Sequence, residues 1–523
     1  MVEDEAHDRA PSVYSTRALS THSSITLPPG LQRIVPPGQG ESAIAVDPKQ
    51  EELKQYDDDW EVDPRNPRNW ALGRKWLMVS IVSLYTFVSP LASSTMAPGL
   101  PLLAERYHIT NETVIALTLS IFLLAFALGP LILGPLSEMY GRTWAFNMGC
   151  AYAPNTGTLI GFRLLAGLSG SAPIACGGGT VGDLFSERDR ASAMALYSLG
   201  PLVGPAIGPV AGGFIANFNR YQIRFRDNRR YMVPAFPSYS VGSTLFLGMC
   251  LLSGIFAVPL LEETYAPVIR ERIAKRSGDL EKAAHFHNPI GEMGKLEYLW
   301  INISRPVILL FRSFICFILS LYMAFMYGIY YLMFTTFPTV FNEIYGFNIG
   351  VGGLVYLGIG IGFLTASAFG AKTADQIYHY LAKRDNNGVG KPEMRIPALF
   401  FGSLFVPVGL FWYGWSAQAK IHWIMPIIGS GIFGFGTMTT FIPIQLYLVD
   451  TFKYAASALA AASVFRSLLG FAFPLFGDQM FNALGLGGGN SLLAGLAILL
   501  GIPFPIWIYY KGEAVRLRSD LSR

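Results

Sequence analysis

Long apolar segments alternate with short polar connections along most of this 523-residue chain. Two early segments, Trp76 to Gly99 and Val114 to Ser137, contain no charged residue, and each is longer than the roughly 20 residues with which an α-helix spans a bilayer. The pattern recurs towards the C-terminus and predicts an all-α membrane protein with twelve transmembrane helices. These predicted helices lie near residues 76–97, 113–136, 143–155, 157–184, 192–217, 240–261, 306–337, 350–371, 396–416, 421–447, 454–480 and 490–510.

The predicted helices fall into two sets of six, which is the expected organisation of a transporter built from repeats. The first set makes an N-terminal half over 71–261 and the second a C-terminal half over 306–511. Between them, 262–305 is polar and rich in Lys and Arg, as expected of a cytosolic linker. Residues 1–70 are rich in Ser, Pro and Asp, so we expect a disordered cytosolic tail. A second, short cytosolic tail covers 512–523.

Lys and Arg gather before the first predicted helix, after the eighth and after the twelfth. Because positive residues are retained on the cytosolic side, we expect both termini in the cytosol. We expect the plasma membrane as the location, with the vacuolar membrane as the alternative.

Two segments do not fit the expected pattern of helix length and charge. The third predicted helix has only about a dozen residues between Arg142 and Asn155, which reach ~20 Å against a ~30 Å hydrocarbon core. Residues 220–230 place five arginines on the predicted outer side.

Composition indicates a membrane protein without catalytic chemistry. Hydrophobic residues make up 52% of the chain and charged residues 14%, so there is more apolar surface than a soluble core can bury. The net charge of +4 comes from basic residues beside apolar segments and does not indicate nucleic acid as a partner. The four cysteines form no CxxC pair, and no metal spacing or phosphate loop is evident. We therefore expect no enzyme activity, no metal and no cofactor.

The fifth predicted helix has a glycine at every fourth position, namely at Gly200, Gly204, Gly208 and Gly212. Glycines at this spacing line one groove and let two helices approach closely. The interleaved prolines, among them Pro209, each remove a backbone hydrogen bond and soften the helix. Such a helix suits a moving transport pathway, and simple membrane-helix packing is the alternative.

Charged residues inside a membrane are costly and are therefore candidates for function. Arg163 lies in the fourth predicted helix and Arg466 near the middle of the eleventh. Each can orient a substrate or respond to proton movement, or instead bind helix carbonyls as a structural cation. After the second predicted helix, Glu138 and Arg142 are four residues apart and can pair. Such a pair either latches neighbouring helices or serves as an ordinary cytosolic anchor.

Acidic residues are missing from the centres of the predicted helices, whereas aromatic residues are plentiful in the seventh to tenth. A polyvalent cation would find no counter-charge there, so we expect a neutral or weakly charged amphipathic organic substrate. Aromatic and polar residues that could line its cavity are Tyr327, Tyr330, Tyr331 and Gln445. Most of these aromatics are expected to pack or to anchor the membrane interface.

From Asp59 onwards the chain resembles the major facilitator superfamily, and within it the fungal twelve-helix drug:proton antiporters. The residues that match the motifs of the second to fifth helices are Gly134, Glu138, Gly141 and Arg142, then Arg163 and Gly167, then Gly204, Gly208, Pro209, Gly212 and Gly213. Stretches similar to the fungal branch are Asp63–Trp70, Ser93–Ser94, Glu263–Pro267, Tyr454–Ala458 and Arg466–Ser467. Two features depart from the family pattern. Thr143–Trp144 replaces basic residues, and the arginine-rich stretch replaces an aromatic-containing turn.

The resemblance implies alternating access of two pseudo-symmetric six-helix halves around a central cavity, with proton entry driving substrate exit. We therefore expect a proton-coupled exporter of small hydrophobic or amphipathic compounds, such as drugs or fungal secondary metabolites. It would work as a monomer, with the small-molecule substrate and membrane lipid as its partners. A polyamine or nutrient carrier of the same fold, and a transport-inactive receptor or relic, are the alternatives.

Overall fold

The computed structural model describes residues 60–140, 170–185, 203–214, 260–278, 295–385, 390–452 and 455–519, together with single positions between 161 and 201 and residue 387. These parts consist of α-helices with short 3-10 and π-helical pieces, and they contain no strand. Seven segments among them are long and apolar enough to cross a membrane. The third predicted helix near 143–155, most of the sixth near 240–261 and the arginine-rich stretch 220–230 lie outside the described residues.

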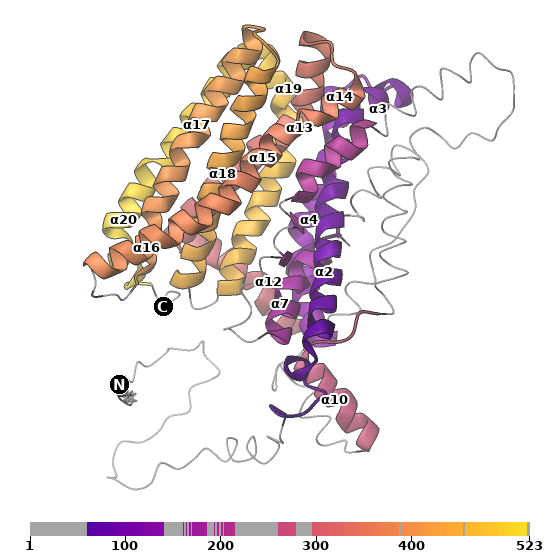
Figure 1. Cartoon of the computed structure of the whole chain (residues 1–523), viewed down its shortest axis with the longest axis vertical. Helices are drawn as coiled ribbons and strands as arrows, with labels where there is room; N and C mark the ends of the chain where they lie inside the picture. The colour runs from indigo at the N-terminus through magenta and orange to yellow at the C-terminus, as the bar shows by residue number, and fades with distance from the viewer. Residues whose placement is uncertain are drawn as a thin grey trace, which may run out of the picture. The chain divides into compact units, whose positions relative to one another are not determined.

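The described N-terminal helices begin after an ordered turn formed by residues 60–70. In this turn Asn66 caps a short helix by accepting a hydrogen bond from the N–H of Arg68, and Trp70 is buried. The elements that follow from this point are η1 (Pro67–Asn69), α2 (Leu72–Ser94), η2 (Ala97–Gly99), α3 (Leu100–Tyr107), α4 (Glu112–Tyr140), α7 (Ala172–Leu184) and the helix Val203–Phe214. Helix α7 packs against both α2 and α4, which run side by side in Figure 1.

A helical linker precedes the C-terminal helices. Helix α10 (Ala266–Ser277) ends at Gly278, whose φ of 80° is a conformation that glycine adopts without strain. Helices α12 (Lys295–Arg312) and α13 (Phe314–Thr339) are separate, because Ser313 has extended backbone and its hydroxyl accepts a hydrogen bond from the N–H of Cys316 at 3.3 Å. The seventh predicted helix therefore begins at Phe314, and α12 runs across the predicted end of the linker.

The C-terminal part continues through several broken helices. They are η3 (Val340–Ile344), α14 (Ile349–Leu354), α15 (Leu357–Thr365), η4 (Ala366–Gly370), α16 (Ala371–Asp385), η5 (Pro392–Arg395), α17 (Ile396–Gln418), α18 (Ile424–Thr451), α19 (Ala455–Gly501) and α20 (Pro503–Arg516). Within α19, Gly485 has a φ of 70° and interrupts the helix. The 60-residue apolar segment Ser457–Arg516 therefore contains both of the last two predicted helices.

Backbone contact at glycines holds α17 against α18. A Cβ placed on Gly409 would lie 2.3 Å from Phe433 N, and one placed on Gly429 would lie 2.6 Å from Tyr413 N. Helix α17 also packs on α19, and α19 packs on α13 and α4. Figure 1 shows α17 and α18 running alongside each other. Helix α19 thus contacts helices of both predicted halves.

Helix α13 is the most enclosed of the apolar spans. Its apolar window is 83% buried, against 33% for the segment Ser457–Arg516. Other helices turn large apolar side chains outwards, among them Phe401, Trp412 and Trp415 of α17. An extended apolar exterior around an apolar core is expected where the surroundings are lipid.

Candidate functional site

Three glycines of the Val203–Phe214 helix, which the sequence places on one face, lie against α2. Cβ atoms placed on Gly204, Gly208 and Gly212 would lie 2.8, 2.6 and 1.9 Å from backbone carbonyl oxygens of α2 and of its C-cap Thr95. Real Cβ atoms essentially never come within 3.0 Å of another heavy atom. Only glycine therefore fits these positions while the two backbones stay in contact.

The same helix meets α14 on another side. A Cβ on Gly213 would lie 2.8 Å from Ile349 O, and a Cβ on Gly353 would lie 2.6 Å from Pro209 O. Both contacts again involve backbone, which cannot give way as a flexible side chain can. The Val203–Phe214 helix is thus held between α2 of the predicted N-terminal half and α14 of the predicted C-terminal half.

Two hydrogen bonds also join the predicted halves. The Ser93 and Tyr331 hydroxyls lie 2.9 Å apart, and Gln479 Nε2 donates to Thr113 Oγ1 at 3.4 Å. Both lie towards the end at which α2 finishes and α4 begins, which we call the Ser94 end. Helices α3 and α14 lie at this end in Figure 1. The described parts of the two halves are therefore joined at the Ser94 end.

Three tyrosines of α13 form one ring cluster, which we call the tyrosine cluster: Tyr327, Tyr330 and Tyr331. The ring centroids of Tyr327 and Tyr331 are 5.0 Å apart, and those of Tyr327 and Tyr330 are 6.0 Å apart. Tyr330 also packs on Phe363 of α15, with centroids 5.1 Å apart. The buried Tyr330 hydroxyl has no hydrogen-bond partner among the described residues. Such a group is costly to leave unpaired, which makes it a candidate partner for a polar group of a ligand.

Arg466 of α19 stacks on the tyrosine cluster. Its Cζ lies 4.9 Å from the centre of the Tyr327 ring, and Nη2 donates to Ser463 Oγ at 3.2 Å. The buried Nε finds no acceptor among the described residues. Arg466 also forms no ion pair within the described part of the chain. The structure therefore brings one predicted cation and three predicted cavity residues to the same place.

The remaining predicted site residues are not part of this cluster. Gln445 lies partly buried on α18 and makes no hydrogen bond to the tyrosines within the described part of the chain. Gly134 and Glu138 lie in the last turns of α4, where side-chain surroundings are not described. The predicted residues that lie outside the described part are Gly141, Arg142 and Arg163.

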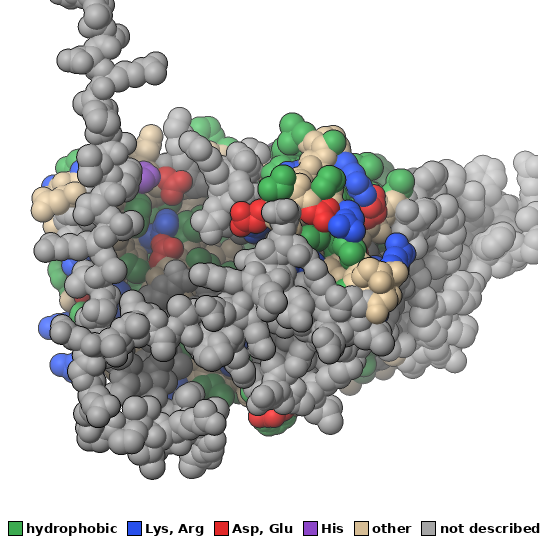
Figure 2. All heavy atoms as spheres, turned by 90° about the horizontal axis from the view of Figure 1, so that it is seen from below, with side chains coloured by type: hydrophobic (Ala, Val, Ile, Leu, Met, Phe, Trp, Pro, Cys, Tyr) green, Lys and Arg blue, Asp and Glu red, His purple; other side chains and the backbone are tan. Residues whose placement is uncertain are grey.

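Ion pairs at the opposite end of the helices, where α2 begins, join C-terminal helices to one another. Arg395 Nε donates to Asp450 Oδ2 at 2.6 Å, and Arg395 Nη1 lies 3.8 Å from Asp375 Oδ1. Arg516 pairs with Glu393 at 3.1 Å. Figure 2, which views the molecule from below, shows acidic and basic side chains beside one another. Arg395 and Arg516 belong to the basic residues that follow the eighth and twelfth predicted helices, and the sequence favours Asp375 and Asp450 as cytosolic network charges rather than ligands.

Polar contacts at this end also join α2 and α7 to the linker. Arg74 Nε donates to Glu262 Oε1 at 3.0 Å, and the guanidinium lies 4.0 Å from the centre of the Trp70 ring. Thr264 Oγ1 donates to Asp183 Oδ2 at 3.4 Å. These contacts stay within the N-terminal half and the first residues of the linker, just as the pairs of Arg395 and Arg516 stay within the C-terminal half.

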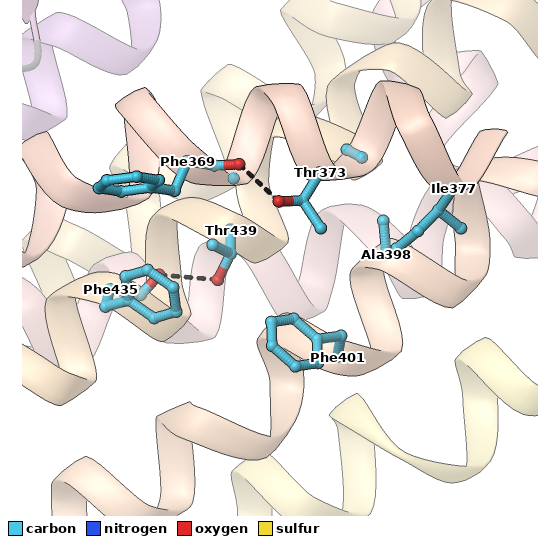
Figure 3. Close-up of a pocket in the computed structure, with 9 residues that line it drawn as sticks. Phe369, Thr373, Ile377, Ala398, Phe401, Phe435 and Thr439 are labelled. Carbon is cyan, nitrogen blue, oxygen red and sulfur yellow. Dashed lines mark hydrogen bonds between the residues drawn. The ribbon is translucent and has the colours of Figure 1, made fainter. Parts of the chain in front are cut away.

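A shallow apolar pocket opens between η4, α16, α17 and α18. Figure 3 shows that the Thr373 hydroxyl donates to the carbonyl of Phe369 in η4 at 2.8 Å, and that the Thr439 hydroxyl donates to the carbonyl of Phe435 in its own helix at 2.7 Å. Phe369 and Phe401, which flank the pocket, are 67% and 46% exposed. The pocket is therefore an opening in the apolar exterior and shares no residue with the tyrosine cluster.

The sequence matches one family model and is similar to other proteins over most of its length. The model of the Major Facilitator Superfamily matches residues 82–474. A protein named MFS transporter cpaT from Aspergillus oryzae is 41% identical over 92% of this chain and 95% of its own length. Efflux pump vrtL from Penicillium aethiopicum is 42% identical over 88% and 90%, and efflux pump radE from Floropilus chiversii is 38% identical over 92% and 88%.

Solved structures show the same fold at low identity. A D-xylose-proton symporter matches with a TM-score of 0.57 at 14% identity, covering 83% of this chain and 98% of its own. The Escherichia coli xylose transporter XylE in a partially occluded inward-open conformation matches with a TM-score of 0.53 at 12% identity, covering 84% and 98%. The likeness confirms the predicted class of all-helical membrane fold.

Proposed function

Because the chain belongs to the Major Facilitator Superfamily, we propose that it is a proton-coupled secondary transporter that exports small hydrophobic or amphipathic organic compounds. The observation that carries this proposal is its near full-length similarity to fungal proteins named efflux pumps. Its substrates would be drugs or fungal secondary metabolites. They would cross the membrane without covalent change, so the protein would not act as an enzyme.

The described contacts support an inward-facing conformation. The positive residues before α2 and after α20 favour cytosolic termini, which makes the Ser94 end the outer end. The halves are joined there through Ser93 and Tyr331, whereas the described ion pairs of Arg395, Arg516 and Arg74 at the cytosolic end stay within one half or its adjoining linker. A transporter closed outside in this way would accept substrate from the cytosol.

The Val203–Phe214 helix would act as the outer seal. Its glycines bring backbone against backbone on α2 and on α14, so it connects the halves without side chains that could rearrange. To release substrate outwards, the contact between Gly213 and α14 would have to separate. The contact of Gly204, Gly208 and Gly212 with α2 would stay, because those helices belong to the same half.

Proton antiport is proposed from the family resemblance and from the chemistry of the cluster. Outward transport against a gradient needs an energy source, and a proton gradient requires no nucleotide site or metal. Arg163 and Arg466 are the candidates for sensing proton movement or orienting substrate, because a charge at membrane depth changes its interactions strongly when neighbouring charge changes. The proposed setting is a monomer in the fungal plasma membrane.

The proposal is tested by transport in plasma-membrane vesicles from a fungal host that lacks its major exporters. Inside-out vesicles with an acidic lumen would be given a panel of fluorescent amphipathic compounds, with and without a protonophore. We expect uptake that requires both the chain and the pH gradient. The control is vesicles carrying the Gly208→Leu variant, since a leucine cannot fit 2.6 Å from the Leu91 carbonyl oxygen.

The other outcomes identify the alternatives. Uptake that persists with the protonophore would contradict antiport and indicate a passive carrier. Preferential uptake of polyamines would support the polyamine carrier. No uptake of any compound by correctly inserted protein would favour the transport-inactive receptor or relic.

A further inference from the structure

Arg466 carries a full positive charge at a depth where a charge is expensive. It lies about 17 Å along the helix axis from Ala455, the first residue of α19, at ~1.5 Å per residue. The hydrocarbon core of a bilayer is ~30 Å thick, so this position is far from both surfaces. Charges held at such depth face the interior of the bundle or a water-filled cavity, and they mark ligand or ion pathways.

The guanidinium uses few of its hydrogen-bond donors inside the described protein. Arginine has five N–H donors and no acceptor. One donor reaches Ser463, the face of the group rests on Tyr327, and the buried Nε has no acceptor among the described residues. A neutral hydroxyl and a ring face do not neutralise the charge. The guanidinium therefore has N–H donors that no acceptor within the described structure pairs with.

The surroundings of Arg466 place it where helices of both predicted halves meet. One turn further along α19, a Cβ on Gly470 would lie 3.0 Å from the Tyr327 ring and 3.1 Å from Leu123 of α4. Helix α19 thus approaches α13 and α4 together. On the α13 side, Tyr330 adds a buried hydroxyl without a described partner. An arginine, a free phenol group and several ring faces therefore lie close to one another.

From this arrangement we propose that Arg466 binds an acidic oxygen of the transported compound, so that the substrate class is aromatic or amphipathic organic acids. A carboxylate, phenolate or enolate supplies the acceptors that the guanidinium lacks, and planar guanidinium groups match such oxygens well. The rest of the compound would pack on the tyrosine cluster, and the Tyr330 hydroxyl would donate to a second oxygen. This inference rests on the proposed export function and narrows its substrate.

The test compares two forms of one compound in the vesicle assay at pH 7. The pair is a fluorescent aromatic carboxylic acid and its methyl ester, which share ring system and size and differ in the acidic oxygen. Arg466→Gln should raise the apparent KM for the acid about 10- to 100-fold, as expected for the loss of one or two charge-assisted hydrogen bonds. The KM for the ester should change by less than about 3-fold, since a neutral ester gains little from the charge.

Two further variants separate binding from folding. Arg466→Lys keeps the charge and loses the planar fork, so it should recover part of the affinity for the acid. Arg384→Gln removes one exposed positive charge from α16, far along the chain from the cluster, and should leave both compounds unaffected. Ester transport by each variant reports that the protein is folded and inserted.

The outcomes distinguish this inference from the function on which it rests. Equal loss of acid and ester transport in both Arg466 variants would assign Arg466 a structural role and overturn the inference. Transport of the ester but not of the acid by the unaltered chain would also overturn it, while leaving the export function intact. Transport of neither compound, nor of any other in the panel, would overturn the export function and the inference with it.

Discussion

Replacing Gly212 by alanine should separate the Val203–Phe214 helix from α2. The added methyl group would lie 1.9 Å from the carbonyl oxygen of Thr95, whereas ordinary contact begins at 3.4 Å, so the two backbones must move apart by about 1.5 Å. Because the clash is with backbone, no side chain can turn away to relieve it. Overpacking of this kind costs about 1–3 kcal/mol.

This cost has two measurable consequences. If the strain is present in all conformations, thermal stability falls, because α2 and the Val203–Phe214 helix stay together throughout transport. The buried thiols of Cys176 and Cys316 become accessible on unfolding, so a thiol-reactive dye followed during heating of detergent-purified protein reports the change. The displaced helix also carries Gly213, which meets α14 and would have to separate from it during transport. Substrate uptake into vesicles should therefore fall by about 5- to 150-fold if the same free energy disfavours the conformation closed at the Ser94 end.

Gly178→Ala in α7 is the matched control. A Cβ at Gly178 meets nothing within 4 Å, and alanine is favoured over glycine inside a helix by about 1 kcal/mol. This variant should therefore be as stable as the unaltered chain or slightly more stable, with unchanged uptake. If Gly212→Ala matches Gly178→Ala in both thermal stability and uptake, the inference that Gly212 lies in close backbone contact with α2 is contradicted.

Three more perturbations follow from described contacts. Arg395→Gln leaves two carboxylates at the cytosolic end without their partner and should lower stability by about 1–3 kcal/mol in the same melting assay, with partial recovery in Arg395→Lys; an unchanged melt would show that the network does not stabilise the fold. Tyr331→Phe and Ser93→Ala should each weaken the closure at the Ser94 end by about 0.5–1.5 kcal/mol, seen as faster labelling of that end from outside, and the double variant should add little further, whereas additive effects would argue against a shared hydrogen bond. Hydrogen bonds from Arg65 lower the pKa of Asp63 below its usual value. That carboxylate therefore stabilises the 60–70 turn above the unfolded pKa and loses this effect as the pH falls through the lower, folded one. Limited proteolysis of the turn should increase at acidic pH in the unaltered chain, and Asp63→Asn should abolish the step.

The extents of many helices follow from the sequence because a bilayer imposes a local requirement of length and apolarity. Helices α4 and α17 begin within a residue of the predicted helices near 113–136 and 396–416. The break between α12 and α13 was missed, although Arg312 and Ser313 interrupt the apolar run there. The cap at Ser313 was the local signal that could have indicated it.

For the glycine repeat, the sequence determines the face of the helix and the tertiary structure determines the partner. A repeat of four residues places its glycines on one face of a helix, and that periodicity indicates a groove for close approach. It does not say which helix enters the groove, because every helix has a backbone that could fit. Packing made α2 the partner of Gly204, Gly208 and Gly212, and it turned Gly213 towards α14.

The residues of the tyrosine cluster could be identified from the sequence, but their contacts with one another could not. Arg466 and the tyrosines of α13 stand out along the chain because a charge or a polar ring at membrane depth has a cost that belongs to the residue and its own segment. Gln445 stood out for the same reason, yet it makes no hydrogen bond to the cluster among the described residues. The contact between Arg466 and Tyr327 depends on how α19 lies against α13. Many contacts throughout the bundle determine that arrangement together. Burial and its cost are local properties that a chain displays residue by residue, whereas a contact belongs to two distant segments and exists only once the whole bundle has packed.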